Sequence, residues 1–573
     1  MLHIQINYVM GNNKIFEEIM RVADSQKPMT FTDKEVKPII DHLKKKKASD
    51  KEGWRNEMLI EGGDEMVKSI RMMTNQILET EQQPEQWVNM IINSVHKKKD
   101  IKKLENKRGL FLTNIISKVF EKLVDSRTNL QYDKGQCGGM KRRGPIDNWF
   151  LLMALRDTFK QLKKNVYLFF ADLVKCFDKL WLKDCIVDIW KAGLREKEAK
   201  TVYLLNKKAK IWIKTPVGMT ESIEVDEVVK QGTVFAVKLC CSTTGNVNTI
   251  GPKPITVIKP TITTGAVVFV DDILGGGNSG PVKGVMNNCV KMEKQKKMEF
   301  STDKSNWMVM KTGKRNETVE ELTVEIKQGV IPRTEEYKYL GNMVNEQGDI
   351  ETQLEAMENK IGGIVREANI MGGYETVGNM EVSVKLLLYD KTITKTVFYN
   401  MEAWTNLRQG DKQRLEVIQG KILKKLLNIP KSTPYWGLLI ELGIWPVEWY
   451  INYRKLMLLH NLFHSDDERL AKQVMVEQKQ SGQENCWYSE VKEIVEVLQI
   501  HHDPEEMTKQ EWKKITKDAI YAKVEVEAKT KSADMKKLRF VRGFAQGFKQ
   551  KDYLTEMTAY EAKKVGLSHV KSC

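Results

Sequence analysis

The sequence predicts an α+β protein with several subdomains. Two runs rich in β-branched and aromatic residues, 166–171 and 265–270, lead directly into aspartates, as strands do when they end at a polar edge. From Ile350 onward the apolar residues recur at helical spacing. A chain of 573 residues is also too long for one simple core.

Composition describes a folded protein with a polyanionic partner. Hydrophobic residues make up 41% and charged residues 29%, which argues against a disordered chain. The net charge of +16 favours nucleic acid as the partner, with a merely soluble basic protein as the alternative. The 8 cysteines form no CxxC pair, which suits a reducing compartment and argues against a zinc knuckle.

The start of the sequence and its apolar runs bear on where the protein is located. Residues 1–10 lack a basic cluster followed by an apolar core, and no apolar run approaches the roughly 18 residues of a membrane span. We therefore expect a nuclear and/or cytoplasmic protein that is neither secreted nor bound to a membrane. The lysines at 44–47 resemble a nuclear signal, but a solvated helix end is the simpler interpretation.

The N-terminal part is expected to be mainly helical. Residues 1–30 are poorly patterned and are expected to be a tail or a truncated edge. A helix should follow from Thr30, capped by Thr32 or Asp33. The later elements expected here are a helix over 67–78, a strand over 91–95 that runs into a cationic turn, and helices over 114–123 and 149–162.

The stretch Gly265–Leu274 is the centre of the expected site. Its apolar run meets Asp271 and Asp272 and resumes at Ile273, which predicts a hairpin with an acidic tip. Because adjacent side chains on a strand point to opposite faces, the two carboxylates share a face only if a tight turn falls between or at them. Taken alone, the pair is better explained by a solvated turn.

A second stretch supplies another carboxylate. The run 166–171 ends in Asp172 and then changes to helical spacing, with Phe177 on the apolar side. Two such strands side by side would place Asp172 and Asp271 on one edge. Carboxylate oxygens suit Mg²⁺, and two such ions about 3.5–4 Å apart serve phosphoryl transfer.

Together these motifs resemble the palm of reverse transcriptases, most closely those of the non-LTR (LINE-type) retrotransposons. The motifs are, in chain order, Phe170-Ala171-Asp172 with Phe177-Asp178, Lys230-Gln231-Gly232-Thr233, and Phe269-Val270-Asp271-Asp272. Each is weak alone, but their order and separations fit the family. The resemblance implies a right-hand polymerase with fingers, palm and thumb, an antiparallel palm sheet, and a helical C-terminal extension.

The resemblance also divides the chain, over roughly residues 30 to 465 of its length. We expect a tail or truncated edge at 1–30, fingers and an N-terminal extension at 31–163, a palm with the catalytic aspartates at 164–345, a helical thumb at 346–440, and a helical, basic C-terminal extension at 441–573. The role of residues 477–573 is not readable from the sequence.

Catalytic roles follow from the resemblance. By the family's mechanism, Asp172, Asp271 and Asp272 would hold two Mg²⁺ ions, with Mn²⁺ as a substitute. Lys304 would neutralise or protonate the leaving pyrophosphate. An ordinary surface lysine is the alternative interpretation of Lys304.

Substrate contacts are also implied. Arg108 and one of the lysines 97–99, for which we take Lys98, would grip the incoming triphosphate, because a planar guanidinium contacts phosphate oxygens bidentately. Gln231 and Gly232 would bear on the nucleotide and template base. Phe177, five residues after the first aspartate, would exclude a 2′-hydroxyl and so favour DNA synthesis. The alternative interpretation of Arg108 and the lysines 97–99 is an ordinary basic loop. The alternative interpretation of Phe177 is a phenylalanine of the hydrophobic core.

Two further segments resemble parts of the family that touch nucleic acid. The basic run 138–144 would track the template strand, and the turn at 337–341 lies where the family holds the primer end. His460 and His464 stand four apart beside two aspartates. We interpret them as packing histidines, because no third metal ligand is evident.

The expected function is RNA-directed DNA synthesis, with an RNA template, a DNA primer or nicked target DNA, and dNTPs as partners. No segment resembles a nuclease, so a separate endonuclease domain or protein is expected to make the nick, and the chain resembles the polymerase part of a larger element or a host gene derived from one. Lys107 and Ala236 depart from the family's pattern. They leave open a catalytically inactive, maturase-like RNA-binding protein, whereas Phe177 disfavours an RNA-dependent RNA polymerase.

Overall fold

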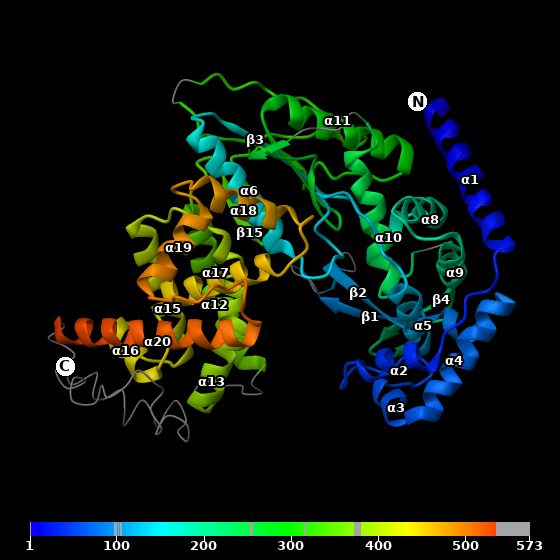
Figure 1. Cartoon of the computed structure of the whole chain (residues 1–573), viewed down its shortest axis with the longest axis horizontal. Helices are drawn as coiled ribbons and strands as arrows, with labels where there is room; N and C mark the ends of the chain where they lie inside the picture. The colour runs from blue at the N-terminus through cyan, green and yellow to red at the C-terminus, as the bar shows by residue number, and fades with distance from the viewer. Residues whose placement is uncertain are drawn as a thin grey trace.

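The computed structural model describes residues 2–96, 100, 102–103, 106–227, 229–251, 256–259, 261–314, 317–371 and 380–534. The helices within residues 2–126 and 182–206 lie on one side of the molecule, whereas the helix over 145–161 lies with the C-terminal helices on the other (Figure 1). No helix in these ranges is long and apolar enough to cross a membrane.

The N-terminal half is helical outside its sheets. Its helices are α1 (Leu2–Ser25), α2 (Asp33–Asp41), α3 (Asn56–Glu61), α4 (Gly63–Thr80), η1 (Glu85–Val88), α5 (Ile115–Ser126), α6 (Pro145–Gln161), α7 (Cys176–Lys179), α8 (Leu182–Lys191), α9 (Glu196–Asn206), α10 (Val234–Gly245), η3 (Asn246–Asn248) and α11 (Ser279–Lys296). The helices expected near 33, 67–78, 114–123 and 149–162 are confirmed.

Helix α1 corrects the expectation of a tail over residues 1–30. Phe16, Ile19 and Ala23 lie on one face of α1 and are buried against α8 and α9. Their spacing of three and four residues places them on one stripe of the helix. The polar residues between them mask this short stripe in the sequence.

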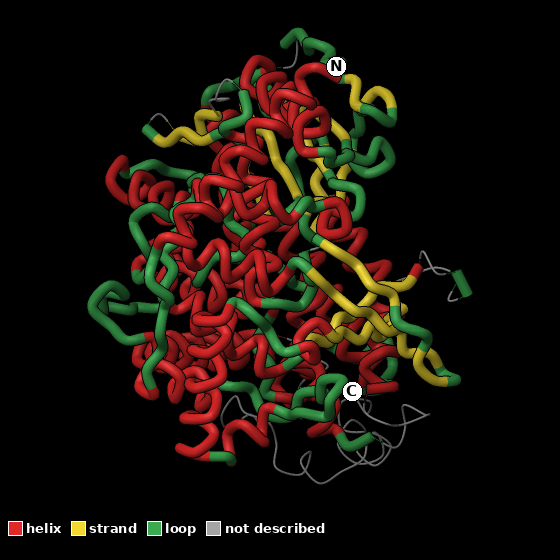
Figure 2. Tube along the Cα trace, turned by 90° about the vertical axis from the view of Figure 1, so that its right-hand side faces the viewer, coloured by secondary structure: helices red, strands yellow, loops and turns green. Residues whose placement is uncertain are grey.

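A five-stranded sheet projects from the N-terminal half. Its strands are β1 (Asn89–His96), β2 (Lys107–Thr113), β4 (Lys208–Thr215), β5 (Gly218–Met219) and β6 (Ile223–Asp226). β1 pairs antiparallel with β2 and parallel with β4, while β5 and β6 both pair with β4. The long strands extend away from the helical body (Figure 2).

A four-stranded antiparallel sheet lies between the two halves of the molecule. It consists, in spatial order, of β11 (Asn306–Met310), β3 (Val166–Ala171), β10 (Asp272–Gly277) and β9 (Val267–Phe269). Ala171 pairs with Ile273, and Phe170 pairs with Leu274. This register sets the ends of β3 and β10 side by side.

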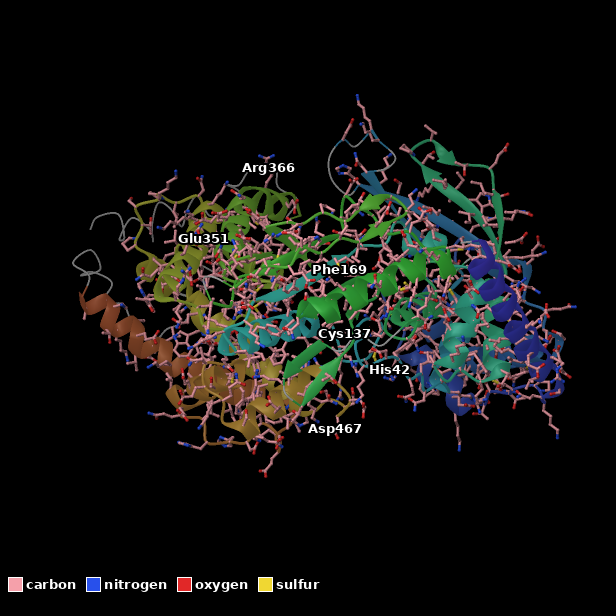
Figure 3. All side chains as sticks on the ribbon, turned by 90° about the horizontal axis from the view of Figure 1, so that it is seen from above. His42, Cys137, Phe169, Glu351, Arg366 and Asp467 are labelled. Atoms are coloured by element: carbon pink, nitrogen blue, oxygen red, sulfur yellow. The ribbon has the colours of Figure 1, made fainter. Side chains whose placement is uncertain are left out.

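Both faces of this sheet are buried. Along β3, Leu168 and Phe170 belong to the core shared with α6 and the C-terminal helices, whereas Tyr167 and Phe169 belong to the core shared with α8, α10 and α11. Alternation of side chains across a strand produces this division. Phe169 accordingly lies near the middle of the molecule when it is seen from above (Figure 3). Two-sided burial explains why β3 is apolar throughout.

Helices dominate the C-terminal half. They are α12 (Glu351–Met371), α13 (Val382–Leu388), the π-helix η4 (Tyr389–Ile393), α14 (Thr394–Val397), η5 (Met401–Ala403), α15 (Gln409–Leu426), α16 (Tyr435–Leu442), α17 (Val447–Phe463), α18 (Leu470–Ser481), α19 (Trp487–Val497) and α20 (Lys509–Asp534). The remaining strands form two-stranded ribbons: β7 (Thr256–Lys259) with β8 (Ile262–Thr264), β12 (Glu325–Ile326) with β13 (Gly329–Val330), and β14 (Glu336–Tyr339) with β15 (Asn342–Asn345).

Buried ion pairs join the C-terminal helices to α6. Arg469, at the start of α18, donates to Asp147 of α6 over 2.6 Å, and both side chains are 1% exposed. Arg156 of α6 donates to its neighbour Asp157 and to the hydroxyl of Thr405. The C-terminal helices are therefore fixed to the helix that covers one face of the central sheet.

Candidate active site

The acidic hairpin has the form that the sequence predicted. β9 and β10 are joined by Val270 and Asp271, and Phe269 pairs with Asp272 across the turn. Val270 has a φ of 59°, a left-handed conformation that is rare for a β-branched residue. Such strain persists only where the surroundings hold it in place. The turn at Val270 and Asp271 breaks the strand alternation and lets both carboxylates lie at one end of the sheet.

A loop at 135–138 holds this turn from behind. The side-chain oxygen of Gln136 accepts hydrogen bonds from the backbone N–H of Val270 at 3.2 Å and of Gly138 at 2.9 Å. Cys137 donates its backbone N–H to the carbonyl of Val268 at 2.8 Å. A Cβ on Gly138 would lie 2.4 Å from the Val270 nitrogen, so the close approach requires glycine. Sequence reasoning missed Gln136, whose one signal was a glutamine with glycines on both sides.

Asp172 lies at the end of β3 and meets Lys304. The Nζ of Lys304 is 3.1 Å from Oδ1 of Asp172. The backbone N–H of Asp172 donates to the hydroxyl of Ser305 at 3.1 Å, and its carbonyl accepts from Ser301. The segment 301–305 therefore fixes both the position of Asp172 and the cation beside it.

The three carboxylates repel one another. Burial raises the pKa of Asp271, and the negative charge of Asp172 raises it further, while Lys304 and Arg108 oppose the rise. Burial, followed by the charges of Asp271 and Asp172, raises the pKa of Asp272 to about 7. Burial is the larger cause of both rises in pKa, and the charges of the neighbouring carboxylates add to it.

The donor chemistry of this cluster fits a hard divalent cation. Mg²⁺ takes oxygen ligands, and a cation would relieve the repulsion among Asp172, Asp271 and Asp272. In this structure the cation at Asp172 is Lys304. Among the described residues, no group of three or more His, Cys, Asp or Glu side chains is placed so that it could hold a metal ion.

The predicted nucleotide contacts lie around one loop. Gly232, with a φ of 85°, lies so close to β2 that a Cβ there would be 2.7 Å from the carbonyl of Phe111. Arg108 lies on the same strand, three residues earlier. Gln231 donates from Nε2 to Oδ1 of Asp178 at 2.8 Å, next to the half-buried Phe177. Lys98 falls outside the described residues.

The comparisons with known proteins agree with this geometry. Residues 95–344 match the family model for reverse transcriptase (RNA-dependent DNA polymerase). The chain contains a reverse transcriptase domain. The match indicates an RNA-directed DNA polymerase, a nucleotidyltransferase, and it spans both aspartate motifs and Lys304. No curated protein matches the chain.

The reverse transcriptase domain also buries an ionisable pair beneath the 230–233 loop. Glu121 of α5 accepts a hydrogen bond from the backbone N–H of Val234 at the start of α10. Burial raises the pKa of Glu121 to about 7, and burial lowers the pKa of Lys230 to about 8. The Nζ of Lys230 donates to the carbonyl of Leu205. This pair supports the loop that carries Gln231, and sequence reasoning did not find it.

The ribbon of β14 and β15 contacts Lys304 and the strand that leads to Asp172. The central residues of its turn are Leu340, with a φ of 41°, and Gly341, with a φ of 93°. The hydroxyl of Tyr337 donates to the carbonyl of Lys304 at 2.7 Å, and its ring stacks on Phe170 with centroids 4.2 Å apart. The segment expected to hold a primer end is therefore attached to the candidate active site.

The basic run 138–144 differs from its expected role. The side chain of Arg143 is 4% exposed and pairs with Asp466 at 3.0 Å, and Arg142 donates to the carbonyl of His464. Both arginines are thus bound to the C-terminal helices and are not free to track a template. The packing interpretation of His460 is confirmed, since its Nε2 lies 3.0 Å from the carbonyl of Met507.

Proposed function

We propose that this chain is the reverse transcriptase of a non-LTR retrotransposon and extends a DNA primer on an RNA template. The observation that carries the proposal is the pairing of Ala171 with Ile273, which brings Asp172 beside Asp272 and the Asp271 turn. In this proposal, 31–163 are the fingers with an N-terminal extension, 164–345 the palm, 346–440 the thumb and 441–573 the C-terminal extension of a right-hand polymerase.

The acidic cluster is the proposed catalytic centre. Asp172, Asp271 and Asp272 are the residues that would hold two Mg²⁺ ions or Mn²⁺, which when bound would activate the attacking 3′-hydroxyl and neutralise the phosphates. Lys304 leaves Asp172 when the nucleotide arrives and turns its charge to the leaving pyrophosphate. Its side chain is 65% exposed, so this movement meets little resistance.

Arg108 and the 230–233 loop are the proposed dNTP contacts. Arg108 faces the triphosphate from β2, because its guanidinium already lies in the field of Asp271. Gln231 and Gly232 bear on the nucleotide and template base. Phe177 lies next to Asp178, the partner of Gln231, and excludes a ribose 2′-hydroxyl.

Substrate choice tests this assignment. Wild type should incorporate dNTPs opposite an RNA template and should largely reject rNTPs. Phe177→Val should raise the ratio of rNTP to dNTP incorporation at least about tenfold, since a missing side chain no longer blocks the hydroxyl. Preferential rNTP use by wild type would instead identify an RNA-dependent RNA polymerase.

We further propose that this chain extends a nick without making one, and that a separate endonuclease domain or protein supplies it. A DNA duplex with a preformed nick, together with an annealed RNA template, should be extended by wild type and not by Asp172→Asn. Supercoiled plasmid should stay intact under the same Mg²⁺ conditions. Nicking of that plasmid by the pure protein would refute this part of the proposal.

A further inference from the structure

A large hollow lies outside the reverse transcriptase domain, among the C-terminal helices. Its volume is about 1060 Å³, and its walls come from α13, η4, α17 and α20. These helices lie together on the C-terminal side of the molecule (Figure 1). We call it the C-terminal groove, and its lining includes Lys395, Trp445, Tyr453, Lys513, Lys517 and Tyr521.

Cations outnumber carboxylates in the C-terminal groove. Its lining holds the lysines 391, 395, 513 and 517 and Arg454, but Asp390 is the single acidic residue among the described lining residues. Lys391 pairs with Asp390 at 2.6 Å, and Arg454 pairs with Glu402. The other three lysines form no ion pair with a described residue. A groove with free cations attracts a polyanion.

Aromatic rings lie between these cations. Trp445 meets Tyr453 with ring centroids 5.6 Å apart and Tyr521 with centroids 5.0 Å apart, both edge to face. Tyr521 is 43% exposed, and the other two rings are half-buried. Alternating aromatic faces and cations are the arrangement that binds single-stranded nucleic acid, since bases stack on the rings and phosphates follow the charges.

The cations and rings are ordered along the helices. Lys513, Lys517 and Tyr521 follow at intervals of four residues and so share one face of α20. Lys391 and Lys395 stand four apart across the π-helical turn η4. Single π-helical turns occur frequently at functional sites. The groove therefore combines the lysines of α20 and Lys395 with an aromatic cluster in one lining.

The C-terminal groove also reaches the turn beside the active site. Tyr399 lines the groove, and its carbonyl accepts a hydrogen bond of 2.9 Å from Asn342 of β15. A Cβ on Gly341 would lie 3.3 Å from the Tyr399 ring. Because Tyr337 of the same ribbon is bonded to Lys304, this ribbon contacts both the candidate active site and a residue that lines the groove.

We propose that the C-terminal groove binds a single-stranded stretch of RNA, stacked on Tyr521 and Trp445 with its phosphates along Lys513 and Lys517. The inference rests on the proposed function for the identity of the nucleic acid as template RNA. Binding itself requires no catalysis. An acidic protein segment would pair with the lysines but would offer no flat ring to stack on the aromatic side chains.

Fluorescence anisotropy of a labelled oligo(rU) of about 20 nucleotides, with the full chain in buffer without Mg²⁺, tests the groove. The double variant Lys513→Glu/Lys517→Glu should bind at least about tenfold more weakly. Its plot of log affinity against log salt should be shallower by about 1.4, since each lost phosphate contact removes about 0.7. Tyr521→Ala should weaken binding about fivefold or more, and Tyr521→Phe should restore it.

The matched control is Lys514→Glu, an exposed neighbour on α20 that does not line the groove. It should bind within about twofold of wild type, because a single charge away from the site is screened by salt. A loss equal to that of the double variant would show general electrostatic attraction and overturn the proposal. Equal competition by polyglutamate and unlabelled oligo(rU) would overturn it as well. If the double variant unfolds at a lower temperature than wild type, oligo(rU) binding by Tyr521→Ala tests the proposal instead.

The two proposals fail separately. Asp271→Ala should bind oligo(rU) as wild type does, because Asp271 lies outside the groove. If wild type binds oligo(rU) in the predicted pattern but does not extend a primer, the proposed polymerase activity is refuted and the proposed RNA-binding groove is supported. If wild type extends the primer normally but the groove variants bind oligo(rU) as wild type does, the groove proposal is refuted and the polymerase proposal is supported.

Discussion

The side-chain oxygen of Gln136 accepts a hydrogen bond of 3.2 Å from the backbone N–H of Val270, the residue directly before Asp271. The same oxygen accepts from Gly138, so one buried amide joins the strained turn to the loop behind it. Val270 keeps its left-handed φ because the backbone on both sides is bonded. The position of Asp271 therefore depends on a side chain that takes no part in the chemistry.

Gln136→Met should impair catalysis more than binding. It leaves two buried N–H groups without their acceptor, at a cost of about 1–3 kcal/mol, and lets the turn move. We expect kcat for primer extension to fall about tenfold with KM for the primer–template nearly unchanged. Gln131→Met, at an exposed position nearby, is the control and should be neutral. An equal loss of kcat in both variants would show that Gln136 has no specific role in positioning Asp271.

Gly138→Ala should disturb the same turn by a steric route. The added Cβ would lie 2.4 Å from the Val270 nitrogen, so the hairpin must shift. Steady-state primer extension should fall at least about tenfold, while circular dichroism retains the wild-type spectrum. Gly144→Ala is the matched control, because nothing lies within 4 Å of its added Cβ. Full activity of Gly138→Ala would show that the loop does not position Asp271.

Glu121→Gln should change how stability depends on pH. Burial raises the pKa of Glu121 from 4.5 to about 7, although Lys230 and Lys118 lower it in part. Between these values the folded protein binds the proton more tightly than the unfolded chain, so the free energy of unfolding falls as pH rises. Glu121→Gln has no proton to lose at this position, so its free energy of unfolding does not show this fall. Relative to wild type it should gain stability between about pH 5 and pH 8, on the order of 3 kcal/mol.

Urea unfolding of wild type and Glu121→Gln across that pH range makes the comparison. The glutamine oxygen still accepts from Val234, so the hydrogen bond is preserved while the titration is lost. Parallel stability curves for the two proteins would contradict the raised pKa. If the stability gain of Glu121→Gln over wild type grew as pH fell, the pKa of Glu121 would be lowered and not raised.

Arg469→Met should loosen the C-terminal helices from α6. The substitution leaves Asp147 charged, 1% exposed and without its ion partner, which costs about 3–5 kcal/mol. Urea denaturation should show this loss, and Asp147→Asn/Arg469→Met should recover part of it. Arg21→Met, whose ion pair with Glu18 is exposed, should leave stability nearly unchanged. Equal effects of the two single substitutions would contradict the buried docking pair.

Local sequence patterns predicted most of the candidate active site. The hairpin at Asp271 and the strand before Asp172 were predicted because apolar runs that end in acids are local signals, and the structure confirms both. The contacts of Gln136 and Glu121 were not predictable in this way. Each joins segments far apart in the chain, and a buried polar side chain has no periodicity that reveals its partner.

Tertiary pairing explains the other differences. Arg143 reads as a free basic residue in sequence, but Asp466 neutralises it from the C-terminal helices. Helix α1 acquires its stability from packing on α8 and α9, since its apolar stripe is short. These outcomes depend on how distant elements meet, which spacing within one segment does not encode.

Primer extension on a poly(rA)–oligo(dT) duplex with Mg²⁺, wild type beside Asp271→Ala, tests the central claim most directly. We predict extension by wild type alone, with both proteins giving the same circular dichroism spectrum. Extension by both would contradict the assignment of Asp271. Extension by neither, with salt-sensitive RNA binding retained, would show an RNA-binding protein that has lost its polymerase activity.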